Sequence, residues 1–139
     1  MQEYMRNTDV EALWPPSFPS CERPVELSAW KSQLRKGAAE LAVLAALGRR
    51  ESYGLELLER VRGEGGLELA EGSIYPLLNR LQKEGKVASR WVEDADASHP
   101  RKYYALTAEG AALLAAMLSE WSRFEVGMRR ILGQGAPGG

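Results

Sequence analysis

The sequence predicts a mostly helical domain that carries a small β-hairpin and ends in one long helix. Three segments between residues 28 and 85 place apolar residues at helical spacing, and the pattern then changes to strand-like alternation in KVASRWVED. A segment rich in alanine and leucine follows Thr107, its predicted N-cap, and continues to about Leu132. The 139 residues, 45% of them hydrophobic and 27% charged, are enough for one globular domain with its own core.

The composition excludes several classes of protein. The chain has one cysteine, Cys21, and one histidine, His99, so it cannot form an internal disulfide framework, and we expect no metal site. No run approaches the roughly 18 apolar residues of a membrane-spanning helix, and the first residues lack a basic segment followed by an apolar one. We therefore expect a cytoplasmic protein without a cofactor. The pI of about 5.9 argues against an extended coat of positive charge but does not exclude a local basic face.

Both ends of the chain differ from its middle. Residues 1–27 contain four prolines and scattered aromatic residues without helical or strand spacing, which predicts an irregular arm. We interpret Cys21, in this arm, as a surface thiol, or as a redox switch if it joins a second chain in a disulfide. Residues 133–139 are rich in glycine and predict a disordered tail. We therefore predict that the rest of the chain consists of a folded domain, residues 28–106, and a long helix, residues 107–132.

Capping residues mark the first two predicted helices. Ser28 is a candidate N-cap for the first helix, and Gly48 is a candidate stop. Ser52 is a candidate N-cap for the second helix, which is short and apolar on one side. The glycines at residues 63–66 are expected to end it.

The third predicted helix has one apolar and one polar face. Pro76 lacks an amide donor and is tolerated near a helix start, so this helix is expected to begin close to Ser73, or to bend there, and to end at Gly85. Its apolar stripe consists of Ile74, Leu77, Leu78 and Leu81. The opposite face carries Tyr75, Asn79, Gln82 and Lys83, with Pro76 and Arg80 beside them. Such side chains can pair with bases or phosphates in the major groove of DNA, although a polar face is also the ordinary solvated side of a helix.

The predicted hairpin joins residues 87–94 to the strand RKYYAL through the turn ADASHP. Its far end carries His99, Arg101 and Lys102 around Pro100, a basic tip that can reach phosphates or a minor groove. In many proteins, however, charged residues at a hairpin tip only keep the edge of the sheet soluble and have no binding role. A polar helix and a basic hairpin on consecutive elements favour contact with DNA.

Four strings resemble the PadR family of transcriptional regulators, which have a winged helix-turn-helix fold. They are QLRKGAAELAVLAAL, SYGLELLERV, GSIYPLLNRLQKEGKV and PRKYYALTAEG, and the resemblance covers roughly residues 33–132. It implies a repressor that contacts its operator through the third helix and the wing and is displaced by small ligands. The chain departs from the family pattern in two places. Asp94 and Asp96 put acidic groups near the cations of the wing. The N-terminal arm is longer than in compact family members, so the resemblance implies no role for it. The candidate DNA-binding residues are Tyr53, Ser73, Tyr75, Pro76, Asn79, Arg80, Lys83, His99, Arg101, Lys102 and Tyr103.

The long helix carries an apolar seam whose residues are separated alternately by three and four positions, the spacing of a helix that packs against a partner helix. At about 1.5 Å per residue the helix is roughly 39 Å long, more than a small domain can cover. The seam therefore predicts a homodimer, with two recognition helices facing a pseudo-palindromic site. Packing against the first helix of the same chain is the simpler alternative, and both can hold. The candidate interface residues are Leu114, Met117, Leu118, Trp121, Phe124, Met128 and Ile131.

Trp121 lies in the middle of this seam. A tryptophan in such a position is ordinarily part of a core, because large aromatic side chains dominate buried area. The string SEWSRFE is also similar to that of multidrug-sensing PadR members, in which a pair of tryptophans stacks on flat ligands at the dimer interface. The resemblance thus implies an effector site for a flat hydrophobic molecule at Trp121, Met117 and Phe124.

Other functions have less support in the sequence. The string GEGG lacks the lysine and hydroxyl residue of a phosphate-binding loop, and no carboxylate or nucleophile is expected to converge on His99. We therefore predict no enzyme and no catalytic residues. The sequence predicts a ligand-responsive repressor that binds a pseudo-palindromic operator as a homodimer. The alternative is a winged-helix module that binds another protein without direct contact to DNA.

Overall fold

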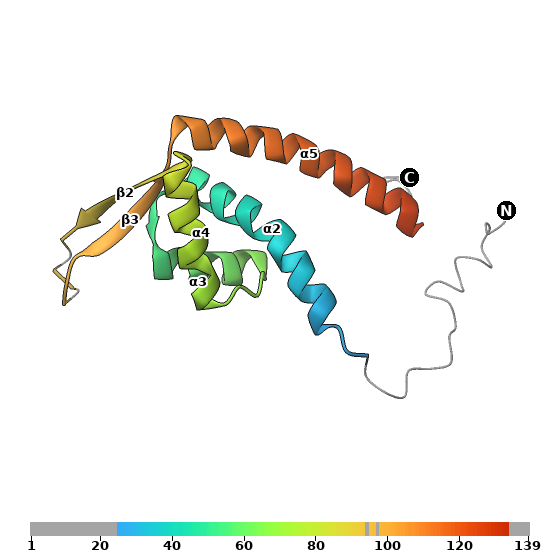
Figure 1. Ribbon diagram of the computed structural model, residues 1–139, viewed down its shortest axis with the longest axis horizontal. Helices are drawn as coiled ribbons and strands as arrows, with labels where there is room; N and C mark the ends of the chain where they lie inside the picture. The colour runs from blue at the N-terminus through green and yellow to red at the C-terminus, as the bar shows by residue number, and fades with distance from the viewer. Residues whose placement is uncertain (1–24, 94, 97, 134–139) are drawn as a thin grey trace. The chain divides into compact units, whose positions relative to one another are not determined.

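The computed structural model describes residues 25–93, 95–96 and 98–133. The order of elements is α2 (Ser28–Arg49), β1 (Ser52–Tyr53), α3 (Gly54–Gly65), α4 (Glu71–Lys83), β2 (Val87–Val92), β3 (Arg101–Leu106) and α5 (Ala108–Leu132) (Figure 1). This confirms the predicted mostly helical fold with a small β-hairpin and a long last helix. The core, the sheet and the site all belong to one compact unit that begins at Ser32.

Several predictions concern residues outside the described ranges. They are the irregular arm up to residue 24 with its Cys21, the acidic Asp94, and the glycine-rich tail from residue 134. None of the helices within the described ranges combines the length and apolar character needed to cross a lipid bilayer. The same ranges hold no cluster of three or more histidine, cysteine, aspartate or glutamate side chains arranged to bind a metal ion.

The ends of α2 differ from the prediction. Ser28 is the first helical residue and does not cap the helix. Its backbone N–H instead donates a hydrogen bond of 2.6 Å to Glu26 Oε1, and hydrogen bonds with Ser28 lower the pKa of the Glu26 carboxyl. Gly48 was expected to stop the helix but lies inside it, where a Cβ would be 3.1 Å from Leu114 Cδ2. Its role is therefore to let α5 approach α2 closely.

A short strand was missed between the first two helices. Ser52 and Tyr53 form β1, which pairs antiparallel with β3 through Ser52 opposite Tyr104 and Tyr53 opposite Tyr103. The predicted capping role of Ser52 is wrong, because Ser52 is completely buried and its hydroxyl accepts a 2.7 Å hydrogen bond from Arg60 Nη1. Two residues are too few to show an alternating pattern, so pairing with a distant strand makes this element.

The start of α4 is earlier than predicted. The helix begins at Glu71, two residues before Ser73, and contains Pro76. The N–H of Ser73 donates to the carbonyl oxygen of Ala70 at 2.9 Å, a tight turn that adds these residues to the helix. The predicted end is confirmed, since the helix stops at Lys83 and Gly85 adopts the left-handed conformation with φ 79°.

The sheet has the strand order β1-β3-β2, with β2 and β3 forming the predicted hairpin. In the hairpin Trp91 is opposite Lys102, Ser89 opposite Tyr104, and Val87 opposite Leu106. Because side chains alternate along a strand, these residues share one sheet face, and at its inner end that face buries Val87 and Tyr104 in the core. The outer end of the hairpin extends away from the helices (Figure 1).

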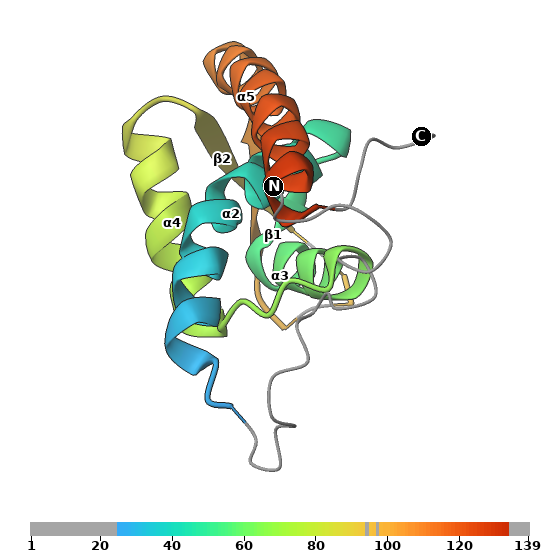
Figure 2. The ribbon, with the colours of Figure 1, turned by 90° about the vertical axis from the view of Figure 1, so that its right-hand side faces the viewer.

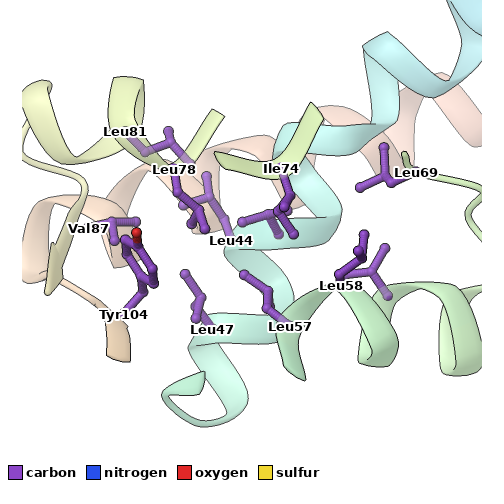
Figure 3. Packing of buried hydrophobic residues seen from close by; sticks show 12 residues of the cluster. Leu44, Leu47, Leu57, Leu58, Leu69, Ile74, Leu78, Leu81, Val87 and Tyr104 are labelled. Atoms are coloured by element: carbon purple, nitrogen blue, oxygen red, sulfur yellow. The ribbon is translucent and has the colours of Figure 1, made fainter. Parts of the chain in front are cut away.

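The core joins three helices to the sheet. Figure 3 shows Leu44 from α2, Ile74 and Leu78 from α4, and Val87 and Tyr104 from the sheet packed together, with all of them at most 4% exposed. In Figures 1 and 2, α2, α3 and α4 lie together on one side of α5. The rest of the cluster consists of Val43, Leu47, Leu57, Leu58, Val61, Leu69 and Leu81, of which Leu57, Leu58 and Val61 belong to α3. The apolar stripes of α3 and α4 thus meet in one core, whereas only the second half of α2 reaches it and Leu34, in the first half, is 52% exposed.

The first turn of α5 is tied to the end of α4. Thr107 caps α5 as predicted, since its Oγ1 accepts a 3.0 Å hydrogen bond from the N–H of Gly110. The same hydroxyl donates to the carbonyl oxygen of Gly85 at 2.7 Å, and the N–H of Thr107 donates to that of Lys86 at 3.1 Å. A Cβ on Gly110 would collide with the carbonyl oxygen of Lys86. Glycine at this position therefore allows the two segments to touch.

We expect Gly110→Ala to lower the free energy of unfolding by about 2–3 kcal/mol, because the added methyl group meets backbone that cannot rotate away. Urea denaturation measures this value. The control is Gly63→Ala within α3, where nothing lies within 4 Å of the added Cβ; there alanine should be neutral or stabilise by about 0.5–1 kcal/mol. Equal effects of the two substitutions would contradict the close contact at Gly110.

Candidate nucleic-acid interface

The polar face of α4 points away from the core. Ile74, Leu78 and Leu81 are fully buried, which fixes the rotation of the helix about its axis. The residues on the other side are all exposed: Ser73, Tyr75, Pro76, Asn79, Arg80, Gln82 and Lys83. This surface offers amide, hydroxyl and cationic groups along three turns of one helix.

Arg80 differs from its neighbours on this face because it has carboxylate partners. Its Nη2 is 2.9 Å from Oε1 of Glu40 on α2, and its Nη1 is 3.3 Å from Oε2 of Glu84. The hydrogen bond with Glu40 is the main cause that raises the pKa of Arg80. Exposed ion pairs of this kind are worth at most about 1 kcal/mol, so the guanidinium can exchange Glu40 for another anion.

Tyr75 lies over the start of α3. A Cβ on Gly54 would be 2.5–2.9 Å from three atoms of the Tyr75 ring, closer than any ordinary contact. The Tyr75 ring can therefore occupy this position only because residue 54 has no side chain. Tyr75 is 39% exposed there. The sequence around Gly54 contains no signal for this contact, because it depends on how α3 and α4 meet.

One face of the wing carries a stack of aromatic and cationic side chains. The guanidinium of Arg101 lies 4.3 Å from the centre of the Tyr53 ring. Tyr53 and Tyr103, which are paired across β1 and β3, meet edge to face with 5.4 Å between ring centres. Beside them Arg90 Nη2 contacts both carboxylate oxygens of Glu51, at 2.8 and 2.9 Å. These contacts attach the hairpin to β1.

The other face of the wing borders a groove, which Tyr53 and Arg101 of the first face also line at its edge. Lys102 Nζ lies 5.9 Å from the centre of the Trp91 ring and 5.6 Å from that of Tyr104. Burial raises the pKa of the Tyr104 phenol, and the nearby Tyr75 adds to this rise. The groove has a volume of about 550 Å³ and is lined by Tyr53, Gly54, Leu55, Tyr75, Trp91, His99, Pro100, Arg101, Lys102 and Tyr104.

This groove brings together five of the eleven residues predicted to bind DNA, from β1, α4 and the wing. Asn79 and Lys83 lie further along α4 on the exposed face, with Ser73, Pro76 and the ion-paired Arg80, whereas Tyr103 belongs to the opposite wing face. The prediction omitted Trp91, Leu55 and Tyr104, which also line the groove. Trp91 had a signal in the sequence, since it is a large aromatic residue in a hairpin whose tip is basic.

A second groove lies between α2 and α5. Its volume is about 540 Å³, and its lining residues are Gln33, Leu34, Gly37, Ala38, Leu41, Ala116, Met117, Glu120, Trp121 and Phe124. The rings of Trp121 and Phe124 are 5.6 Å apart at their centres. The three residues predicted to bind an effector therefore line one apolar groove within a single chain.

The predicted dimer seam divides into two parts along α5. Leu114 and Met117 are half-buried and pack against the core of their own chain. Leu118, Trp121, Phe124, Met128 and Ile131 are exposed, with Ile131 at 80%. Packing within the chain and an open apolar face thus both occur on this helix, which the sequence analysis allowed.

A three-helix core whose last helix exposes a polar face beside a two-stranded wing defines a winged helix-turn-helix protein. The transcriptional regulator PadR-like family matches residues 43–116. A PadR family transcriptional regulator from Eggerthella lenta is 32% identical, with a TM-score of 0.67 over 76% of this chain and 91% of that one. A PadR-like regulator from Bacillus cereus is 33% identical, with a TM-score of 0.66 over 75% and 99% of the two chains.

A PadR-like transcription factor from Bacteroides fragilis is 32% identical, with a TM-score of 0.60 over 74% of this chain and 98% of that one. Among curated proteins no relative matches the sequence. The chain belongs to the PadR-like family of transcriptional regulators. Members of this family regulate transcription and are not enzymes, in agreement with the prediction from the sequence.

The contact between Gly54 and Tyr75 is tested by a double-mutant cycle. We expect Gly54→Ala to lower the free energy of unfolding by about 1 kcal/mol, because the Tyr75 ring must leave its preferred rotamer. In a Tyr75→Ala background the same substitution should cost almost nothing. Urea denaturation of the four proteins measures the coupling, and an equal cost in both backgrounds would contradict the assigned contact.

Proposed function

We propose that this chain is a sequence-specific repressor that binds a pseudo-palindromic operator as a homodimer and releases it when an effector binds. The observation that carries the proposal is the groove in which Tyr75 of α4 meets Lys102 and His99 of the wing. One continuous surface then offers a helix for the major groove and cations for the adjacent backbone. Such a regulator acts where the chromosome lies, which for this family we take to be the cytoplasm.

In the proposed complex the exposed face of α4 enters the major groove. Asn79 is suited to bidentate pairing with adenine, while Lys83 and Lys102 are suited to phosphate oxygens. Arg80 reaches the duplex by exchanging Glu40 and Glu84 for phosphate or guanine, which the exposure of these ion pairs permits. Arg101 and Tyr103 support the wing through the stack with Tyr53.

The proposed homodimer uses the open face of α5. Phe124 is 56% exposed, Ile131 is 80% exposed, and Met128 between them is also exposed on the same seam. A second copy of the helix would remove this seam from water at about 25 cal/mol per Å². Two-fold symmetry then sets the two α4 helices about one turn of DNA apart.

The proposed effector is a flat hydrophobic molecule held by Trp121, Met117 and Phe124 in the groove between α2 and α5. Two links lead from this groove to α4. The first link is the ion pair between Arg80 of α4 and Glu40 of α2. Glu40 lies in the α2 sequence between Ala38 and Leu41, which line the groove. Thr107 holds the carbonyl oxygen of Gly85 from the start of α5. A molecule that moves α2 against α5 therefore acts on the position of α4, and about 1.4–2.8 kcal/mol of differential binding changes operator affinity by ten- to a hundredfold.

Selection of duplexes from random-sequence DNA with the purified full chain tests the DNA-binding proposal. We expect enrichment of a two-fold symmetric site whose half-sites are about one helical turn apart. On the selected duplex, Lys102→Ala should weaken binding to all sequences and reduce the salt slope by about one unit, because one phosphate contact is lost. Asn79→Ala should relax the choice at one base pair per half-site.

Fluorescence anisotropy of labelled duplexes at several salt concentrations measures these effects. Gln33→Ala, in the groove between α2 and α5, is the control and should leave DNA affinity unchanged. If no sequence is enriched and binding to DNA does not depend on salt, the chain is a winged-helix module for protein partners and the proposal is wrong.

The effector groove is tested with 8-anilinonaphthalene-1-sulfonate, a flat apolar probe whose fluorescence rises in dry surroundings. We expect Trp121→Ala to weaken probe binding at least fivefold, since the indole forms part of the groove wall. Trp30→Ala is the matched control, because Trp30 is a tryptophan on α2 outside the lining residues. Equal probe affinity in wild type and Trp121→Ala would dismiss the groove as an effector site.

A further inference from the structure

Trp91 is an exposed aromatic residue that neither the core nor the dimer seam explains. It is 68% exposed, although tryptophan is among the residues that proteins bury most on average. Other strongly exposed apolar side chains lie on α5, such as Ile131, or in the first half of α2, such as Trp30. Trp91 instead lies on β2, within the groove that the wing shares with Tyr75. Its exposure in the free protein therefore leaves a large apolar surface available on the side of the molecule that carries the polar face of α4.

The position of the indole is fixed by the sheet. Trp91 is paired with Lys102 across the hairpin, and its side chain shares a face with Ser89 and Val87. Since Val87 is buried against the core, this face is directed toward the helices, and the outer end of the hairpin carries the same face into the groove. The amine of Lys102 lies 5.9 Å from the centre of the indole ring. The groove therefore presents an apolar surface and a cation side by side.

This pairing matches the chemistry of a nucleic-acid backbone. Each nucleotide offers an apolar deoxyribose surface next to a negatively charged phosphate, and contacts to sugar and phosphate position a protein on its duplex. The strand that separates the major from the minor groove has to pass between a helix in the major groove and a wing beside it. In this chain that passage is the groove of about 550 Å³ between Tyr75 and the wing.

From this placement we infer that Trp91 contacts DNA, packing its indole against deoxyribose of the strand that crosses the groove while Lys102 pairs with the adjacent phosphate. This rests on the proposed function and adds a contact that does not read sequence. Trp91 fixes the distance between α4 and the backbone, so it contributes affinity to every duplex and leaves the preference among sequences unchanged.

The test uses the full chain and the duplex selected from random DNA, with a scrambled duplex alongside. We expect Trp91→Ala to weaken binding to both duplexes by a similar factor of about 5–10, with the dependence on salt unchanged, because no charge is removed. Trp91→Phe should restore part of the affinity, since an aromatic surface remains. Val92→Ala, the next residue on β2 with its side chain on the opposite sheet face, is the matched control and should bind like wild type.

A second measurement leaves Trp91 in place. With Trp14, Trp30 and Trp121 replaced by phenylalanine, and with duplex binding by this variant verified by fluorescence anisotropy, the remaining indole should change in emission when the duplex is added, as expected for a side chain that leaves water. Wild-type affinity in Trp91→Ala, or an unchanged emission of this single tryptophan, overturns the inference. If Lys102→Ala then still reduces the salt slope, the DNA-binding proposal survives without Trp91; if the wild-type chain binds no duplex, both fail.

Discussion

The anchoring of α4 by its own leucines and isoleucine is the constraint on which the interface depends. Ile74, Leu78 and Leu81 are buried against α2, α3 and the sheet, so the helix cannot rotate without exposing them. Each fully buried side chain of this size is worth about 1.5–3 kcal/mol. Because Tyr75, Asn79 and Lys83 alternate with these anchors, burying one set turns the other to the outside, and the packing of the core decides which groups α4 presents on its exposed face.

The wing is held to this helix through β1, and this link gives the interface its second half. The buried hydroxyl of Ser52 accepts a hydrogen bond from Arg60, and Ser52 itself pairs with a residue of β3. The guanidinium of Arg101 lies over the ring of Tyr53. The groove exists because Gly54, directly after β1, leaves room for the Tyr75 ring. A short strand and one glycine thus fix the spacing between the polar face of α4 and the cations of the hairpin.

The sequence was sufficient for the elements whose patterns are local. Helical periodicity predicted the buried faces of α3 and α4 and part of that of α2, alternation predicted the hairpin, and Thr107 was identified as the cap of α5. Features that depend on distant partners were missed or wrong: Ser52 pairs with Tyr104, and Gly48 packs against Leu114 rather than ending a helix. The same distinction applies to the candidate site. The polar face of α4 could be predicted from a local pattern. The groove with Trp91 and the ion pair of Arg80 with Glu40 could not, because they depend on how separate elements meet.

The two helices that border the apolar groove are both tied to α4 or to the turn after it, α2 through Glu40 and the start of α5 through Thr107, so the open face of α5 and the polar face of α4 belong to one packed unit. The most direct test of the account is the change in backbone amide NMR shifts when the selected duplex is added to the full chain. The account predicts the largest changes at Tyr75–Lys83 and at the wing residues His99–Lys102, with the buried Leu44 and Leu58 little affected. Changes confined to α5, with α4 unaffected at saturating DNA, would contradict it.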